Sequence, residues 1–459
     1  MAQAQLAIRK LFNGNGLVQT IMRTSAINVL VMVITTITSI VTARMFGVEG
    51  KGEFSAILFW PTFLVGIVGF GLPTSLIYNM KRHAGKGAEY IRAGFLFQLA
   101  VSIVVGVVSW ICLPVWLGNY SAEVVQTAKW YTVLTLPLLL AVNLIAALAQ
   151  SSDNFRTYNG VRLFVPLFNL AGIFALFSIG VLSIHAASFV YLITTLLVVI
   201  WSLYQLRGEL RIDWLRRMVD KAAAGSLFGY GSRVFGVELL GTLYSQFDKI
   251  IILSLLTPRD FGLYSVVYAL SRVFNTVQMA ISNVIFPKLT GMDKDKVIST
   301  VGRAFRLSLI LMTIVVVPSM IIGRFLMGLL FGNEFLEAST AFYLLSIECI
   351  LGGGSWILAA SFNALGRPGL VLIRQIIALA ITIGLFFLFT PLYGLNGIAL
   401  SLVVGALARM IITIAAMRVA FKVRFAGMLF DKDDFRFLIG RLREKKFMKR
   451  VGRAGGTDE

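Results

Sequence analysis

The sequence predicts an all-α integral membrane protein with about twelve transmembrane helices, in two six-helix lobes related by a parallel pseudo-twofold repeat. Of its 459 residues, 58% are hydrophobic and only 14% are charged. A soluble protein of this length needs more charge to cover its surface. The apolar residues fall in blocks of about 20 or more, which is the length of helix that crosses a hydrocarbon core. The second half of the chain also echoes the first.

Breaks in the apolar pattern predict the spans in order. The first six are expected at 24–43, 54–79, 90–116, 124–149, 160–181 and 185–206, and the last six at 225–256, 262–288, 301–330, 338–363, 369–391 and 394–421. The predicted domains are therefore an N-terminal cytoplasmic interfacial segment (1–23), an N-lobe (24–206), a basic cytoplasmic linker (207–224), a C-lobe (225–421) and a basic amphipathic tail (422–459).

Positive charge predicts the orientation of these spans. One side of the predicted topology receives 22 Lys and Arg residues before the tail is counted, and the other receives five, Lys51 and Arg259 among them. Because basic loops stay in the cytoplasm, we expect both termini to be cytoplasmic. The tail mixes phenylalanines with bases, which is typical of a segment lying on anionic membrane lipids. The net charge of +20 therefore reflects orientation, and no nucleic-acid partner is expected.

The repeat is visible at an offset of about 210 residues. "RMFGVEGKGEF" (44–54) corresponds to "LLTPRDFGLY" (255–264), which aligns Gly52 with Gly262. "WLGNYSAEVVQTA" (116–128) corresponds to "LFGNEFLEASTA" (330–341). The offset contains six spans, an even number, so both halves insert with the same orientation. Transporters built from such repeats place their site between the two lobes.

Six charged residues are expected deep within the predicted spans, where a single charge costs about 2.5–3.5 kcal/mol on insertion scales. Counting from the external turn near residue 260 predicts two tiers at different depths. Asp248, Lys249, Arg272 and Glu348 form the upper tier, and Glu238 and Arg409 form the lower one. Helical spacing places further polar residues beside them or on the first span: Asn28, Thr38, Ser39, Ser245, Tyr268, Asn275 and Gln278.

Three stretches resemble one known family. "ARMFGVEGKGEF", "FDKIIILSLLTPRDFGLYSVVYAL" and "FGNEFLEASTAF…NALGRPG" are similar to the polysaccharide (O-antigen) flippases of the multidrug/oligosaccharidyl-lipid/polysaccharide superfamily. The resemblance covers roughly residues 20 to 420. It implies two six-helix lobes around a V-shaped cavity, alternating access, and a bacterial inner-membrane location. It also implies an undecaprenyl-pyrophosphate oligosaccharide as cargo for polysaccharide biosynthesis, O-antigen or exopolysaccharide, with other polysaccharide-assembly proteins as partners.

In this interpretation Lys249, Arg272 and Arg409 attract the pyrophosphate, and the three acids hold these bases in position. One acid could alternatively bind the H⁺ or Na⁺ that drives the cycle. A structural alternative is that Asp248 and Arg272 form an interhelical clamp. In the related lipid II flippases the first span carries a charged pair near the point where this chain has Thr38 and Ser39. The sequence therefore places the charge in the second lobe.

Two other functions fit the sequence less well. An ion-coupled multidrug or organic cation antiporter of the same superfamily needs an acidic cavity, whereas three embedded bases balance three embedded acids here. An enzyme of the same glycan pathway needs large external loops, and these are short. The sequence has no phosphate-binding glycine-rich loop, and Cys112, Cys349, His83 and His185 form no ligand cluster. We therefore predict a transporter without a cofactor or metal.

Overall fold

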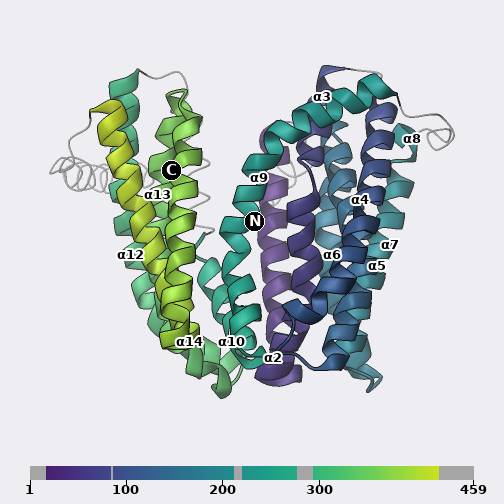
Figure 1. Cartoon of the computed structure of the whole chain (residues 1–459), viewed down its shortest axis with the longest axis horizontal. Coiled ribbons are helices and arrows are strands. Elements are labelled where there is room, and N and C mark those ends of the chain that lie inside the picture. The colour runs from purple at the N-terminus through teal and green to yellow at the C-terminus, as the bar shows by residue number, and fades with distance from the viewer. Residues whose placement is uncertain (1–16, 84–85, 211–219, 276–292, 423–459) are drawn as a thin grey trace, which may run out of the picture. The chain divides into compact units, whose positions relative to one another are not determined.

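Residues 17–83, 86–210, 220–275 and 293–422 are described by a computed structural model, and they are helical nearly throughout (Figure 1). Contacts divide the chain into two compact units. Unit 1 comprises Met1–Val266 and Leu326–Glu337, and unit 2 comprises Val267–Phe325 and Ala338–Glu459. The predicted all-α membrane fold class is confirmed. Gln278, most of the N-terminal segment, part of the linker and almost all of the tail lie outside the described residues.

Unit 1 contains the helices of the first half and one more. They are α2 (Leu17–Val68), α3 (Leu72–Arg82), α4 (Gly87–Trp116), α5 (Ala122–Ser151), α6 (Phe155–Ser178), α7 (Ile184–Gln205), α8 (Arg207–Leu210) and α9 (Lys221–Leu255). Helix α9 packs against α2, α3 and α4. The compact units therefore have different bounds from the predicted lobes, and the division into repeat-related lobes stays a prediction.

Unit 2 is built mainly from α12 (Lys294–Leu330), α13 (Ser339–Ala364) and α14 (Pro368–Phe421). Its core joins Phe305 of α12, Phe362 of α13 and Met417 of α14, all fully buried. Helix α10 (Pro258–Arg272) contributes to both units, and so does α12, whose last turn lies in unit 1 with most of the short 3₁₀-helix η2 (Asn333–Ala338).

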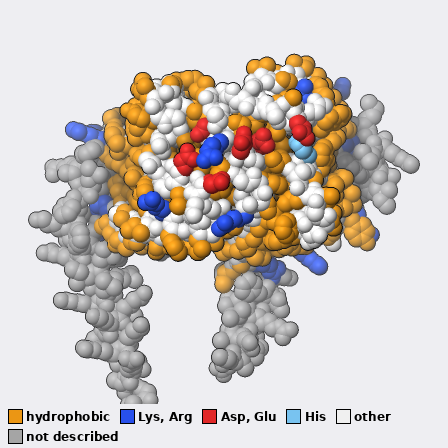
Figure 2. Space-filling view, turned by 90° about the horizontal axis from the view of Figure 1, so that it is seen from below, with side chains coloured by type: hydrophobic (Ala, Val, Ile, Leu, Met, Phe, Trp, Pro, Cys, Tyr) orange, Lys and Arg blue, Asp and Glu red, His pale blue; other side chains and the backbone are white. Residues whose placement is uncertain are grey.

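Outward-facing apolar side chains show that this is a multi-pass membrane protein. Eight helices of the described chain are long and apolar enough to cross a membrane. Ile103, Ile111 and Ile321 are 62%, 68% and 76% exposed, which suits contact with lipid. Figure 2 shows that hydrophobic side chains make up much of the surface drawn in colour. Helix α9, the predicted span 225–256, is not among the eight.

Two long helices each run from one predicted span into the next. Gly47 interrupts α2 with φ 68°, and Gly394 interrupts α14 with φ 53°. Glycine adopts this left-handed conformation without a steric penalty. The breaks fall at or next to the predicted turns between 24–43 and 54–79 and between 369–391 and 394–421. The total of twelve spans stays a prediction, because part of the span expected at 262–288 lies outside the described residues.

The segment predicted as the span 54–79 is not one continuous helix. Helix α2 ends at Val68 and α3 begins at Leu72, with Phe70 and Gly71 at φ 55° and 63°. A positive φ ends the first helix, and Pro73 at the start of α3 favours a new one. A Cβ on Gly71 would lie 2.5 Å from the carbonyl oxygen of Gly231, so this break also lets α9 approach closely.

The two glycines aligned by the repeat contact each other inside unit 1. A Cβ on Gly52 would lie 1.8 Å from the carbonyl oxygen of Pro258, and a Cβ on Gly262 would lie 1.9 Å from that of Val48. The same two Cβ positions lie 2.9 and 3.0 Å from the backbone nitrogen of the other glycine. The contacts of the two glycines are thus reciprocal, and α2 and α10 cross at backbone distance.

Candidate functional site

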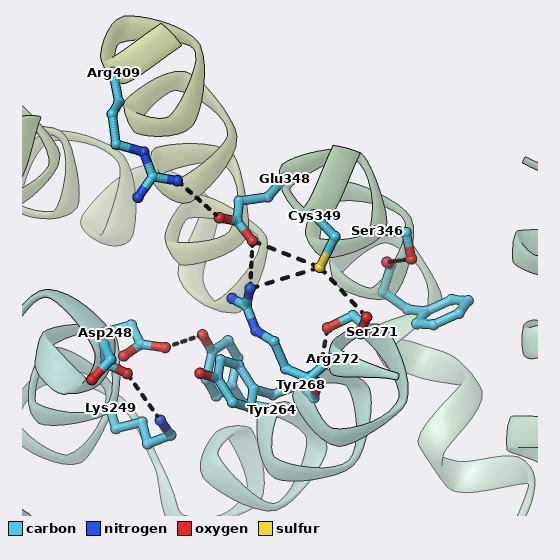
Figure 3. A network of polar contacts seen from close by, with 12 residues as sticks. Asp248, Lys249, Tyr264, Tyr268, Ser271, Arg272, Ser346, Glu348, Cys349 and Arg409 are labelled. Atoms are coloured by element: carbon cyan, nitrogen blue, oxygen red, sulfur yellow. Dashed lines mark hydrogen bonds and ion pairs between the residues drawn. The ribbon is translucent and has the colours of Figure 1, made fainter. Parts of the chain in front are cut away.

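A single carboxylate in unit 2 is shared by two guanidinium groups. Arg272 Nη1, at the end of α10, lies 2.7 Å from Glu348 Oε2 on α13, and Arg409 Nη2, on α14, lies 3.9 Å from Glu348 Oε1. Figure 3 shows Glu348 between the two arginines. The Glu348 and Arg409 side chains are each 8% exposed, and that of Arg272 is 25% exposed. We call these three residues the shared-carboxylate cluster; its formal charge is +1.

A glycine makes room for this cluster. Gly352 lies one turn after Glu348 on α13, and a Cβ there would lie 2.9 Å from Arg409 Nη2 and 3.0 Å from Glu348 Oε1. Helix α13 is continuous from Ser339 to Ala364, so Gly352 serves packing and does not unwind the helix. The ring of Tyr268 lies 4.5 Å from the Arg272 guanidinium carbon, a cation–π distance. These contacts position both arginines.

The prediction that Arg409 lies in a separate lower tier is wrong. Its guanidinium reaches the same carboxylate as Arg272, so it belongs with the residues of the predicted upper tier. The long arginine side chain causes the difference, since depth was counted from backbone positions alone. Glu238 belongs to unit 1, where it accepts a 2.8 Å hydrogen bond from Thr74 Oγ1 of α3.

Asp248 and Lys249 lie together on α9 in unit 1. Tyr264 of α10 donates a hydrogen bond from Oη to Asp248 Oδ2, as Figure 3 also shows. Asp248 is 4% exposed, and its Oδ1 has no hydrogen-bond partner among the described residues. Lys249 Nζ donates to Gln246 Oε1 at 2.6 Å on the same helix. Of the two residues of the suggested clamp, Asp248 thus accepts from Tyr264, whereas Arg272 donates to Glu348 and Cys349.

The predicted polar residues have several environments. Asn28 and Ser245 are exposed, Asn275 is partly buried just beyond α10, and Tyr268 contacts Arg272. Thr38 and Ser39 instead line a cavity of about 150 Å³ inside unit 1. No group of three or more His, Cys, Asp or Glu residues that could hold a metal occurs in the ranges that the structure describes.

The same cavity contains a charged residue that the sequence reading missed. Lys51 was expected in an external turn, which is wrong: it lies within α2, after the Gly47 break, and is 7% exposed. The flanking Glu49 and Glu53 give this segment the composition of a solvated loop. The signal that could have identified it is the spacing of Lys51, Phe54, Ser55 and Leu58, which form one helical face of the cavity lining.

Contacts at the ends of the helices join distant segments of unit 1. Arg44 Nε donates to the carbonyl oxygen of Leu330 at 2.8 Å, and Arg259 Nη2 lies 2.7 Å from Glu337 Oε2. The hydrogen bond and negative charge of Glu337 raise the pKa of Arg259 above its ordinary value. These groups are mostly exposed, so we expect the Arg259–Glu337 pair to contribute at most about 1 kcal/mol.

Comparison with known proteins gives consistent results. A sequence model described as polysaccharide biosynthesis protein matches residues 40–340. The probable low-salt glycan biosynthesis flippase Agl15 of Haloferax volcanii is 25% identical over 182 residues, which are 39% of this chain and 39% of that protein. The aligned part thus spans less than half of that relative.

Two solved structures share the fold. The lipid II flippase MurJ in an inward closed conformation has a TM-score of 0.71 and 14% identity, over 92% of this chain and 96% of its own. An inward-facing multidrug resistance MATE family transporter of the MOP superfamily has a TM-score of 0.69 and 14% identity, over 87% and 95%. At such identities these structures establish the fold alone. The sequence model of the polysaccharide biosynthesis protein family matches more than half of this chain, residues 40–340, so the chain belongs to that family.

Proposed function

We propose that this protein is a flippase that moves a lipid-linked oligosaccharide from the cytoplasmic to the outer leaflet by alternating access. The cargo proposed is an undecaprenyl-pyrophosphate oligosaccharide destined for O-antigen or exopolysaccharide. The membrane is the bacterial inner membrane, with both termini cytoplasmic. Family membership supports a role in polysaccharide biosynthesis. The observation that carries the proposal is the shared-carboxylate cluster, which holds more positive than negative charge at a largely buried position.

The chemistry of this cluster suits a pyrophosphate. A guanidinium donates in a planar fork that matches phosphate oxygens, and such charge-assisted hydrogen bonds are about twice as strong as neutral ones. Glu348 accepts part of the hydrogen bonding that the two guanidinium groups can donate, and it holds Arg272 and Arg409 in position before the cargo arrives. Lys249 is a further candidate for binding the cargo; it lies in unit 1, where its Nζ donates to Gln246 Oε1 at 2.6 Å. We therefore propose that the pyrophosphate binds to Arg272 and Arg409 while Glu348 keeps its contacts with both.

Asp248 is the proposed position for a coupling H⁺ or Na⁺. Its carboxylate is buried, and among the described residues only one of its two oxygens accepts a hydrogen bond, from the Tyr264 hydroxyl. Either a proton or a small cation would compensate the buried negative charge of such a carboxylate. The relevant contacts lie within unit 1.

An ion-coupled multidrug or organic cation antiporter is the second candidate, because the MATE structure fits the fold almost as well as MurJ. The shared-carboxylate cluster argues against it. The guanidinium groups of Arg272 and Arg409 would repel an organic cation. A pyrophosphate meets the same charges favourably.

Replacing Lys249 with Gln is expected to abolish complementation of a strain that lacks this gene. Surface polysaccharide, detected by gel and staining, should fall at least about tenfold, because a hydrogen bond to a charged group contributes about 1.5–3 kcal/mol. Membrane levels of the protein should not change. The matched control is Lys81→Gln, since Lys81 is half exposed and pairs with Asp153. Full complementation by Lys249→Gln would remove Lys249 from the site, and a change in drug resistance without a change in polysaccharide would favour the antiporter.

A further inference from the structure

Unit 1 contains a polar cavity that the proposed cargo chemistry does not use. It has a volume of about 150 Å³ and lies between both halves of α2, α6 and α7. Most of its polar lining residues are neutral: they include Ser39, Thr42, Ser55, Asn169 and Tyr191. Lys51 is the only charged residue among the lining residues that the structure describes.

The Lys51 ammonium is buried without a carboxylate. Its Nζ donates to Thr42 Oγ1 at 2.8 Å, and no described Asp or Glu oxygen lies within the 4.0 Å of an ion pair. Glu49 and Glu53 are each two residues away, which places them about 200° around the helix from Lys51. Taking an unpaired ion out of water costs several kcal/mol. The protein atoms described here do not balance this charge.

The cavity offers hydrogen-bond donors in addition to the ammonium. Thr38 and Thr42 donate to carbonyl oxygens of their own helix, each at 2.8 Å, so the Thr42 oxygen is left to accept from Lys51. Asn169 accepts a hydrogen bond from Thr194 through Oδ1, and its amide group retains two N–H donors. Lys51 itself has three donors, of which Thr42 takes one. Such a surplus of donors suits an anion.

We propose that this cavity binds a small monovalent anion, of which chloride is the physiological example, as the counter-ion of Lys51. A halide accepts several hydrogen bonds at once and needs no fixed geometry, which suits an ammonium, an amide and hydroxyl groups around one space. The volume of about 150 Å³ accommodates a halide with accompanying water, since each water occupies roughly 30 Å³ in the liquid. The site is distinct from Lys249 and the shared-carboxylate cluster, so it does not depend on the identity of the cargo.

The test uses the purified full-length protein in detergent, titrated with chloride against gluconate at constant sodium and ionic strength. The temperature of unfolding should rise with chloride along a saturating curve, because a ligand that binds only the folded state stabilises it by mass action. Bromide should act like chloride. Lys51→Met should weaken the apparent chloride affinity at least about tenfold, the effect of losing a hydrogen bond to a charged group.

Two controls keep the outcome clear. Lys129→Met removes a lysine on α5 that lies 5.2 Å from the ring centre of Trp110, outside the cavity lining, and should leave the chloride curve unchanged. If Lys51→Met does not accumulate, Asn169→Leu serves as the second variant and should also lower the apparent affinity for chloride. A wild-type protein that responds equally to gluconate, or a Lys51→Met curve equal to that of wild type, would overturn the proposal. Lys249→Gln should retain the chloride effect, which separates this test from that of the flippase function.

Discussion

Glu348→Gln is expected to lower the free energy of unfolding by about 3 kcal/mol and to abolish transport. The substitution leaves Arg272 and Arg409 beside a neutral amide, and removing one partner of a buried ion pair has costs of about this size. Denaturant titration of the purified protein measures the stability change, and complementation measures transport. The double variant Glu348→Gln/Arg409→Gln removes one positive charge as well, so we expect it to recover part of the stability while transport stays lost.

The Arg259–Glu337 pair provides a matched control for this prediction. Its nitrogen–oxygen distance of 2.7 Å equals that of Arg272–Glu348, but its side chains are 50% and 60% exposed, against 25% and 8%. Glu337→Gln should therefore change stability by no more than about 1 kcal/mol. Equal effects of Glu337→Gln and Glu348→Gln would show that burial of the shared-carboxylate cluster has no energetic consequence.

Gly52→Val and Gly262→Val are expected to prevent accumulation of folded protein. A Cβ at either position would lie less than 2 Å from a backbone carbonyl oxygen, which no rotamer change can relieve. Overpacking of a core costs about 1–3 kcal/mol where side chains can adjust, and more is expected where backbones must separate. Fluorescence-detected size exclusion of tagged variants measures the folded fraction.

The control for the glycine crossing is Gly236→Ala on α9, where a Cβ meets no heavy atom within 4 Å. This change should be neutral or stabilise the helix by up to about 1 kcal/mol. Normal folding of Gly52→Val would contradict the close crossing of α2 and α10.

Much of the helix pattern could be predicted from the sequence, because hydropathy and capping act locally. The spans expected at 124–149 and 185–206 correspond to α5 (Ala122–Ser151) and α7 (Ile184–Gln205). Ser121 and Ser183 accept hydrogen bonds from the backbone of the first turns of these helices and so define where they begin. Gly394, next to the very short predicted turn at 392–393, has the positive φ that a helix break requires.

The candidate site could be predicted only in part, because partners depend on tertiary packing. Glu348, Arg272 and Arg409 were each recognised as charges inside apolar segments. That the two arginines share the Glu348 carboxylate could not be predicted, because it depends on the close approach of α13 and α14. The absence of a side chain at Gly352 permits that approach. Lys51 was missed for the opposite reason, since two neighbouring glutamates gave a buried helical segment the composition of a loop.

The most direct test of the central claim is translocation by the purified protein in proteoliposomes. The probe is a fluorescent undecaprenyl-pyrophosphate oligosaccharide, and a membrane-impermeant enzyme that removes the exposed label reports which leaflet it occupies. The wild-type protein is expected to move the probe between leaflets at a rate that Arg272→Met reduces at least about tenfold. A lipid of the same chain length without the pyrophosphate should not be moved. Equal rates for wild type, Arg272→Met and protein-free vesicles, or export of an organic cation in place of the probe, would contradict the account.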